Sequence, residues 1–179
     1  MKPTDFVIKY YPFAAKTEIK TGINLVAILA QAALESGWGE NAPGNMFFGI
    51  KADKNWKGKK QLLTTFEYFN DDKQGHRFPE VISITPKNNR YLYTVKDYFR
   101  AYETPEGSFN DHADFFFKNS RYSEALKVKH DYKLFIQEIA KAGYATATSY
   151  ADTLISIADS IQNIIENNNL EATIKSTKQ

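Results

Sequence analysis

The feature that most constrains the fold is a helix that ends on glycines and carries an acid in its last turn. Residues 30–39 read Ala-Gln-Ala-Ala-Leu-Glu-Ser-Gly-Trp-Gly. Gly37 and Gly39 predict the helix end, because glycine readily adopts the left-handed backbone of a C-terminal cap. Upstream, apolar residues follow the spacing of a buried helical face, and these are Leu25, Ile28, Leu29 and Ala32.

Glu35 continues this apolar spacing, so we expect its carboxyl group to be desolvated where the helix meets the next loop. Desolvation disfavours the charged form of a carboxyl group and raises its pKa. A carboxyl group that stays protonated near neutral pH suits a general acid. The residues alone therefore make Glu35 a candidate catalytic acid.

Composition narrows the class of protein. At 179 residues the chain is long enough for one domain with a hydrophobic core. The formal charge of +2 does not predict a nucleic-acid partner. No apolar run reaches the roughly 18 residues of a membrane helix, so we expect no membrane insertion. The absence of cysteine excludes disulfides and thiolate catalysis.

The N-terminal third is predicted to be helical. A first helix through Tyr11 is ended or bent by Pro12, and a second short helix covers residues 14–20. Asn24 has the side chain of an N-cap for the next helix. Residues 39–60 are rich in glycine and proline, so they predict a structured loop.

The middle of the chain has the composition of strands. Residues 62–69 are rich in β-branched and aromatic side chains and predict one strand, and residues 91–102 predict another strand or two. Residues 71–90 combine charges with glycine and proline and show no regular pattern. Together these segments predict a small antiparallel β-lobe over roughly residues 60–102.

Helical patterns return in the C-terminal part, at residues 111–119, 123–128, 131–142 and 150–165. Asp131 is the expected N-cap of the third of these helices, and Gly143 is expected to close it. The predicted fold class is α+β and mainly α, with the β-lobe inserted. Residues 1–166 form one domain, and residues 167–179 form a polar C-terminal tail.

Two neighbouring segments carry a specific motif. Glu-Ser-Gly-Trp-Gly at residues 35–39 is followed by Asn-Met-Phe-Phe-Gly-Ile-Lys at residues 45–51. This arrangement resembles the bacterial glucosaminidase family of peptidoglycan hydrolases, glycoside hydrolase family 73. Weaker matches in the family's order extend the resemblance to roughly residues 5–160, and they lie at residues 99–102, 111–115, 119–122 and 140–146.

The resemblance implies a lysozyme-like fold, in which the β-lobe flanks the substrate cleft of a mostly helical domain. It also implies endo-hydrolysis of the β-1,4 bond after N-acetylglucosamine in peptidoglycan glycan strands, by a monomer without a cofactor. Residues 71–90 make the β-region longer than in the family's usual pattern, which bears on the wall of the cleft.

The resemblance assigns catalytic roles to three residues. Glu35 matches the general acid, and Tyr144 matches the tyrosine of the family's Gly-Tyr-Ala-Thr motif. The second carboxylate belongs to a Thr-Thr-Glu-Tyr-like strand, where Glu67 matches with Phe66 interposed. A one-residue shift in a strand turns a side chain to the other face. Substrate-binding side chains are also implied, namely Trp38, Asn45, Phe48 and Tyr68.

Three routes are open for the rest of the reaction. Glu67 acts as the base of an inverting reaction if the two carboxyl groups lie ~6.5–9.5 Å apart. If they lie farther apart in the free enzyme, the β-lobe closes on the substrate. In the third route the 2-acetamido group of the substrate is the nucleophile and no enzymatic base is needed.

Other candidate residues have simpler interpretations. The three histidines, His76, His112 and His130, have no metal-ligand spacing, so no metal site is predicted. His112 is expected to be a structural hydrogen-bonding residue beside Asp111. Trp56 either stacks on a sugar or anchors its own loop.

Two other functions fit the same residues, a lytic transglycosylase on a similar fold and a non-catalytic glycan-binding module. In each case the site of action is the periplasm or the extracellular cell wall. Residues 1–5 lack the apolar region of a signal peptide. We therefore expect either a removed signal or export by phage lysis or a dedicated secretion route.

Overall fold

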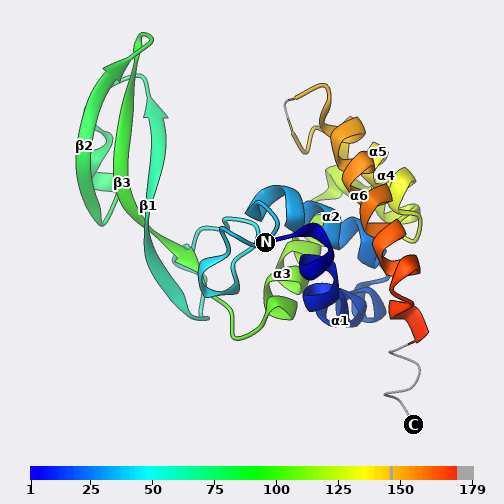
Figure 1. Cartoon of the computed structure of the whole chain (residues 1–179). Coiled ribbons are helices and arrows are strands. Elements are labelled where there is room, and N and C mark those ends of the chain that lie inside the picture. Colours follow the sequence, from blue (N-terminus) through cyan, green and yellow to red (C-terminus); the bar gives the residue numbers. More distant parts are fainter. Residues whose placement is uncertain (146, 173–179) are drawn as a thin grey trace. The chain divides into compact units, whose positions relative to one another are not determined.

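The computed structural model describes residues 1–145 and 147–172, and the chain divides into two compact units (Figure 1). Met1–Phe48 and the chain from Glu103 onward form one of them, the helical unit. Gly49–Tyr102 form the other, the β unit. The predicted fold class, mainly α with a small antiparallel sheet, is confirmed.

The helical unit is built around α2. Its α-helices in the described residues are α1 (Pro3–Thr21), α2 (Leu25–Ser36), α3 (Pro105–Lys118), α4 (Ser123–Lys127), α5 (Tyr132–Lys141) and α6 (Tyr150–Asn167). Two short 3-10 helices, η1 (Pro43–Asn45) and η3 (Ser120–Tyr122), join them. The central helix α2 packs against α1, α5 and α6, and all its residues from 26 to 33 are buried.

The predicted end of the first helix at Pro12 and the separate helix over residues 14–20 are both wrong, because α1 continues through the proline as a single helix. Proline removes the hydrogen bond to the carbonyl group four residues earlier, which here belongs to Ile8. Pro12 and Ile8 both lie on the exposed side of α1, so water can reach that carbonyl group. The opposite side buries Phe6 and Tyr10 before the proline and Ala14 and Ala15 after it, and this burial stabilises the helix on both sides of Pro12.

Side-chain caps fix the helix ends that position the candidate site. The Asn24 side chain accepts a 2.9 Å hydrogen bond from the Val26 N–H, which confirms the predicted start of α2. Gly37 ends α2 with a φ of 58°, as predicted. By contrast, α3 begins at Pro105 rather than at residue 111, because the Thr104 side chain caps it there.

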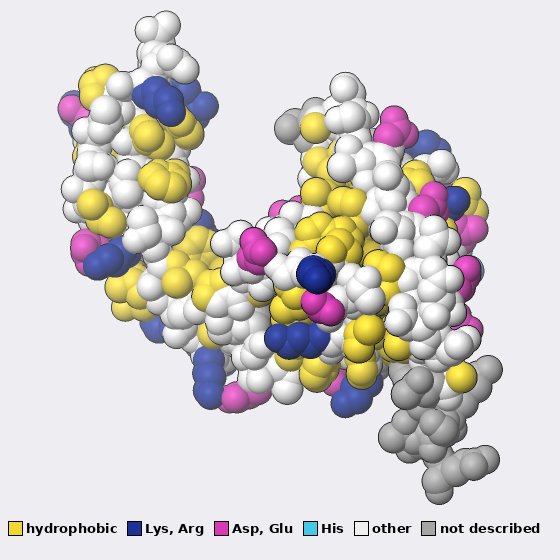
Figure 2. Space-filling model, viewed as in Figure 1, with side chains coloured by type: hydrophobic (Ala, Val, Ile, Leu, Met, Phe, Trp, Pro, Cys, Tyr) yellow, Lys and Arg dark blue, Asp and Glu magenta, His cyan; other side chains and the backbone are white. Residues whose placement is uncertain are grey.

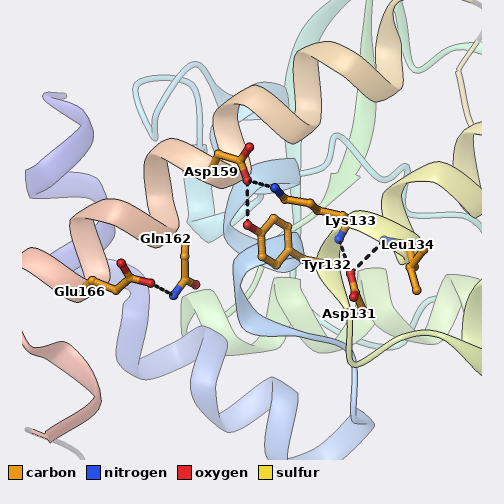
Figure 3. A network of polar contacts seen from close by, with 7 residues as sticks. All are labelled: Asp131, Tyr132, Lys133, Leu134, Asp159, Gln162 and Glu166. Atoms are coloured by element: carbon orange, nitrogen blue, oxygen red, sulfur yellow. Dashed lines mark hydrogen bonds and ion pairs between the residues drawn. The ribbon is translucent and has the colours of Figure 1, made fainter.

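A polar network joins α5 to α6 (Figure 3). Asp131 caps α5 as predicted and accepts hydrogen bonds from the Lys133 and Leu134 N–H groups, at 2.9 and 3.0 Å. Tyr132 donates a 2.7 Å hydrogen bond to Asp159 of α6, and the Lys133 ammonium lies 3.0 Å from the same carboxylate oxygen. α6 then ends at Asn167, and residues 173–179 of the predicted tail lie outside the described residues.

The β unit contains an antiparallel sheet with the strand order β1-β3-β2 (Figure 1). The strands are β1 (Lys60–Phe69), β2 (Glu80–Lys87) and β3 (Arg90–Arg100). Residues 91–102 thus contribute one strand and not two, and the segment without a pattern contains η2 (Gln74–Arg77) and β2. Asn88 and Asn89 form the hairpin turn with φ angles of 51° and 59°, the backbone of a type I′ turn.

The two faces of this sheet differ. On one face Tyr93 and Val95 are fully buried, and Phe69 and Phe78 pack their rings on Tyr93. On the other face large apolar side chains are exposed, and Phe66 has an exposed fraction of 62%. Hydrophobic and basic side chains are interspersed on the visible surface of the sheet in Figure 2. The β unit therefore has a one-sided core, unlike the helical unit.

Candidate active site

Glu35 lies in the last turn of α2 and is exposed, so the prediction that it continues the buried face is wrong. The next residue, Ser36, is buried in its place and donates a hydrogen bond to the Ala32 carbonyl group. The apolar spacing misled here because the middle turns of α2 are buried all round. Such a helix has no single buried stripe that indicates which side of its last turn faces solvent.

The Glu35 carboxyl group is nevertheless partly desolvated by its neighbours, and this desolvation raises its pKa as predicted. Among the described residues it forms no ion pair and no hydrogen bond that would stabilise the charged form. The protonated form of Glu35 therefore persists to higher pH than in an ordinary glutamate. An accessible, protonated carboxyl group has the properties of a general acid.

Tyr144 follows the left-handed residue Gly143, whose φ is 76°. Its N–H donates to the Ile139 carbonyl group at 3.0 Å, and Arg121 donates to the Gly143 carbonyl group at 2.7 Å. Burial raises the pKa of the Tyr144 phenol, and the charges of Tyr150 and Glu35 raise it further. The structure thus brings Tyr144 close enough to Glu35 for their charges to interact.

His112 of α3 shares a 2.8 Å hydrogen bond with the Tyr144 hydroxyl group, between Nε2 and Oη. Burial lowers the pKa of His112 to about 3, so the imidazole is neutral. Phe48 stacks on the same ring with a centroid distance of 3.7 Å and an interplanar angle of 9°. The expected structural role of His112 fits this geometry, with Tyr144 as a partner that its sequence neighbourhood does not reveal.

Gln31 and Tyr150 complete the surroundings of Glu35, and the motif assignments missed both. Gln31 is buried in α2 and donates a 3.3 Å hydrogen bond to the Tyr150 hydroxyl group. It precedes Glu35 by four residues, which places both side chains on the same side of the helix. Burial also raises the pKa of Tyr150, and the Glu35 charge adds to the effect. The available signal was a glutamine within an otherwise apolar helix.

The predicted substrate-binding residues of the helical unit lie on the loop after α2. Trp38 has a φ of 56° and packs edge-on against Phe6 at 5.6 Å. Asn45 donates a 3.2 Å hydrogen bond to the Glu103 carbonyl group. Phe48 is half-buried on His112, so a part of its ring is accessible. All three side chains support the loop, and their substrate contacts remain predictions.

In the β unit, Glu67 lies on the core face of β1. Its Oε1 atom is 2.5 Å from the Lys51 ammonium group, which also lies 3.0 Å from Oδ2 of Asp97. Tyr68 projects from the opposite face and is exposed, with the Arg90 guanidinium 5.5 Å from its ring centroid. The structure therefore does not place Glu67 and Tyr68 on one face of the sheet.

Trp56 has the contacts of a loop anchor. Its indole N–H donates to the Lys59 carbonyl group at 2.8 Å, and the Arg100 guanidinium lies 4.4 Å from its ring centroid. Within residues 1–145 and 147–172, no group of three or more histidine and acidic side chains could hold a metal ion. No helix in these ranges is long and apolar enough to cross a membrane.

A family model described as mannosyl-glycoprotein endo-beta-N-acetylglucosaminidase matches residues 11–163. The chain belongs to the glucosaminidase family. Among curated relatives, peptidoglycan hydrolase FlgJ of Vibrio parahaemolyticus is 35% identical over 168 residues, which are 90% of this chain and 48% of the relative. Exo-glucosaminidase LytG of Bacillus subtilis is 30% identical over 139 residues, covering 73% of this chain and 42% of LytG.

Solved structures of glucosaminidase relatives agree with this membership. The glycoside hydrolase domain of Salmonella typhimurium FlgJ has a TM-score of 0.74 and 25% identity, with both chains fully covered. Peptidoglycan hydrolase from Sphingomonas sp. A1 has a TM-score of 0.61 and 27% identity, covering 92% of this chain and 94% of that one. The chain spans about half the length, or less, of the curated relatives it matches.

Proposed function

We propose that this chain is a peptidoglycan hydrolase that cleaves the β-1,4 bond after N-acetylglucosamine. The observation that carries the proposal is the environment of Glu35 in a member of the glucosaminidase family. This carboxyl group is accessible, has a raised pKa and lies near the half-buried side chain of Tyr144.

Glu35 is the general acid of the proposed reaction. A glycosidic bond breaks through an oxocarbenium-like transition state, and a protonated carboxyl group donates its proton to the leaving oxygen as the bond breaks. Desolvation supplies Glu35 with the raised pKa that this role needs. Tyr144, held by His112, is proposed to contact the reacting sugar beside it.

Glu67 is proposed to complete the reaction as the base that activates water. Its carboxylate lies against the Lys51 ammonium group, which holds one of its two oxygens. A pair of carboxyl groups in opposite environments can divide acid and base roles between them. The substrate-assisted route predicts instead that Glu67 is dispensable, so the two routes are separable by mutation.

The proposed substrate follows the names of the relatives. FlgJ proteins of Vibrio species share 35–36% identity with this chain and are named peptidoglycan hydrolases. The family model's description names a mannosyl-glycoprotein instead, and LytG is named an exo-glucosaminidase. We favour an endo-acting enzyme on glycan strands, working as a monomer in the periplasm or the extracellular cell wall.

Mass spectrometry of purified peptidoglycan digested by the native chain, Glu35→Gln and Glu67→Gln tests the proposal. Hydrolysis adds water and leaves a reducing N-acetylglucosamine end, and internal cleavage gives fragments of many lengths. An anhydro-sugar product would identify a lytic transglycosylase, and stepwise release from chain ends an exo-enzyme. Turnover of a mannosyl-glycoprotein but not of peptidoglycan would overturn the substrate, and binding without turnover would indicate a glycan-binding module.

A further inference from the structure

We infer that Lys51 is a positioning residue for Glu67, an inference that rests on the proposed function. The Lys51 ammonium group lies 2.5 Å from Oε1 of Glu67 and 3.0 Å from Oδ2 of Asp97. It thus bridges a carboxylate of β1 and a carboxylate of β3. The other oxygen of Glu67, Oε2, has no hydrogen-bond partner in the part of the chain that the structure describes.

Backbone pairing fixes Lys51 beside the sheet. Lys51 forms an antiparallel bridge with Phe99, in the part of β3 beyond its pairing with β2. The neighbouring hydrogen bonds, Ala52 N–H to the Tyr98 carbonyl group and Arg100 N–H to the Ile50 carbonyl group, measure 2.8 and 2.9 Å. The Arg100 side chain also donates to the Lys51 carbonyl group at 3.3 Å. The backbone of Lys51 is therefore fixed by its pairing with β3.

Asp97 anchors the ammonium group from the second side. Glu67 pairs with Tyr93, and Asp97 follows Tyr93 by four residues, so both acids project from the same face of the sheet. The Phe78 ring adds a third contact, with its centroid 5.7 Å from the Lys51 nitrogen. Burial would lower the pKa of Lys51, but its bonds to both carboxylates outweigh this and raise the pKa. The lysine stays charged.

This arrangement gives Glu67 one occupied and one available oxygen. A carboxylate that activates water needs an acceptor oxygen directed at that water, and a flexible glutamate samples several rotamers. A fixed bond at Oε1 removes most of that freedom and leaves Oε2 for the substrate water. Preorganised charge of this kind acts on the rate more than on substrate affinity.

The same sheet contains a second lysine–glutamate ion pair, which lies outside the proposed site and serves as a control. Lys96 and Glu80 form a 2.9 Å ion pair across β2 and β3, and neither residue is assigned to the site. Exposed ion pairs of this kind contribute little to stability. Loss of either lysine is therefore expected to leave the fold intact, and only loss of Lys51 should affect the reaction.

The experiment compares Lys51→Met, Lys51→Arg and Lys96→Met with the native chain on soluble glycan fragments. We expect Lys51→Met to lower kcat about 10- to 100-fold, the scale of a misplaced reacting group, with KM changed less than about twofold. Lys51→Arg should restore most of the rate, because guanidinium can bond to both carboxylates. Lys96→Met should behave as native, and thermal unfolding checks the fold of every variant.

A double-mutant cycle decides whether Lys51 acts through Glu67. In a Glu67→Gln background, Lys51→Met should cost less than about twofold more, because the group it positions is already disabled. A full, additive loss in that background would overturn the inference, as would a native kcat for Lys51→Met in a chain that needs Glu67. If Glu67→Gln itself keeps the native rate, the proposed base and the inference fall together, whereas the Glu35 assignment stands.

Discussion

The two candidate carboxyl groups lie in opposite electrostatic environments. In the helical unit, Glu35 has no cationic partner among the described residues, and desolvation raises its pKa. In the β unit, Glu67 bonds to the Lys51 ammonium group. The first environment favours a protonated carboxyl group, whereas the second places a cation against the carboxylate. Under the proposed function this difference matches distinct acid and base roles for the two carboxyl groups.

The two units also hold their site residues in different ways. Glu35 stands at the end of a helix whose middle turns are completely buried, so packing determines its position. Glu67 stands on a sheet with one exposed face, and its carboxylate is bonded to Lys51, which also bonds to Asp97. We therefore expect mutations in the core of the helical unit to cost stability. In the β unit, changes to polar contacts should act locally.

The largest expected effect is that of Glu35→Gln, which should lower kcat about 10²- to 10⁴-fold, because the amide cannot donate an acidic proton. The rate at which soluble glycan fragments are cleaved measures this loss of kcat. Glu40→Gln is the matched control, since Glu40 is an exposed acid that bonds to the N-terminal amine. If Glu35→Gln cleaved glycan at the native rate, Glu35 would not be the general acid. The contrast between Glu35 and Glu67 would then have no catalytic meaning.

The pH dependence of the native enzyme tests whether Glu35 acts in its protonated form. Because the pKa of Glu35 is raised, the alkaline limb of kcat/KM should lie above that expected for an ordinary glutamate. The folded state also holds this proton to higher pH than the unfolded state does, so this contribution to stability is lost as pH rises through the folded pKa. Glu35→Gln should therefore unfold at a slightly higher temperature than the native chain at neutral pH.

The next largest effect should come from the core of the helical unit. Phe47 is buried against Tyr10 and Phe109, with ring centroids 5.0 and 5.1 Å away. Phe47→Ala should lower the free energy of unfolding by about 3–5 kcal/mol, measured by denaturant titration. Phe69→Ala in the half-buried edge of the β unit should cost roughly half as much. Equal losses would contradict the difference in packing between the units.

Local signals in the sequence predicted much of the helical unit and less of the site. Asn24, Gly37 and Asp131 act through neighbours a few residues away, so their caps were readable. The exposure of Glu35 could not be predicted. The middle turns of α2 are buried all round, so the apolar spacing does not indicate which side of the last turn faces solvent. The His112–Tyr144 hydrogen bond joins α3 to the turn after α5, a contact that no local pattern encodes.

In the β unit the missed element was β2, for physical reasons. Val81, Ile82, Ile84 and Thr85 have the β-branched composition of a strand, but Pro86 and the charges and glycine of the preceding segment obscured it. An edge strand tolerates proline, and its position depends on pairing with β3. Asn88 and Asn89 were the available hairpin signal. The composition of β1, by contrast, predicted a strand, and its pairing with β3 sets the face of Glu67, opposite Tyr93.

A smaller effect is expected for Tyr93→Phe in the β unit. The Tyr93 hydroxyl group donates to the Asp71 carbonyl group at 3.0 Å and accepts from the Gln74 N–H at 3.1 Å. Loss of the hydroxyl group leaves the Asp71 carbonyl group and the Gln74 N–H without this partner. The free energy of unfolding should fall by about 1–3 kcal/mol. Hydrogen exchange should accelerate in the β unit alone, whereas Tyr91→Phe on the same strand should change little. Faster exchange throughout α2 would show that the two units unfold together.

The smallest expected effect tests the role of Tyr68. Its ring lies on the face of β1 opposite to Glu67, so a glycan contact there is remote from the bond that Glu67 serves. Stacking on such a ring is worth about 0.5–1 kcal/mol, so Tyr68→Ser should raise KM about two- to fivefold and leave kcat unchanged. Phe66→Ser changes a more exposed hydrophobic side chain of that face and separates stacking at Tyr68 from general apolarity. A fall in kcat for Tyr68→Ser would instead connect the outer face of the sheet to the chemical step, and the assignment of separate duties to the two faces would be wrong.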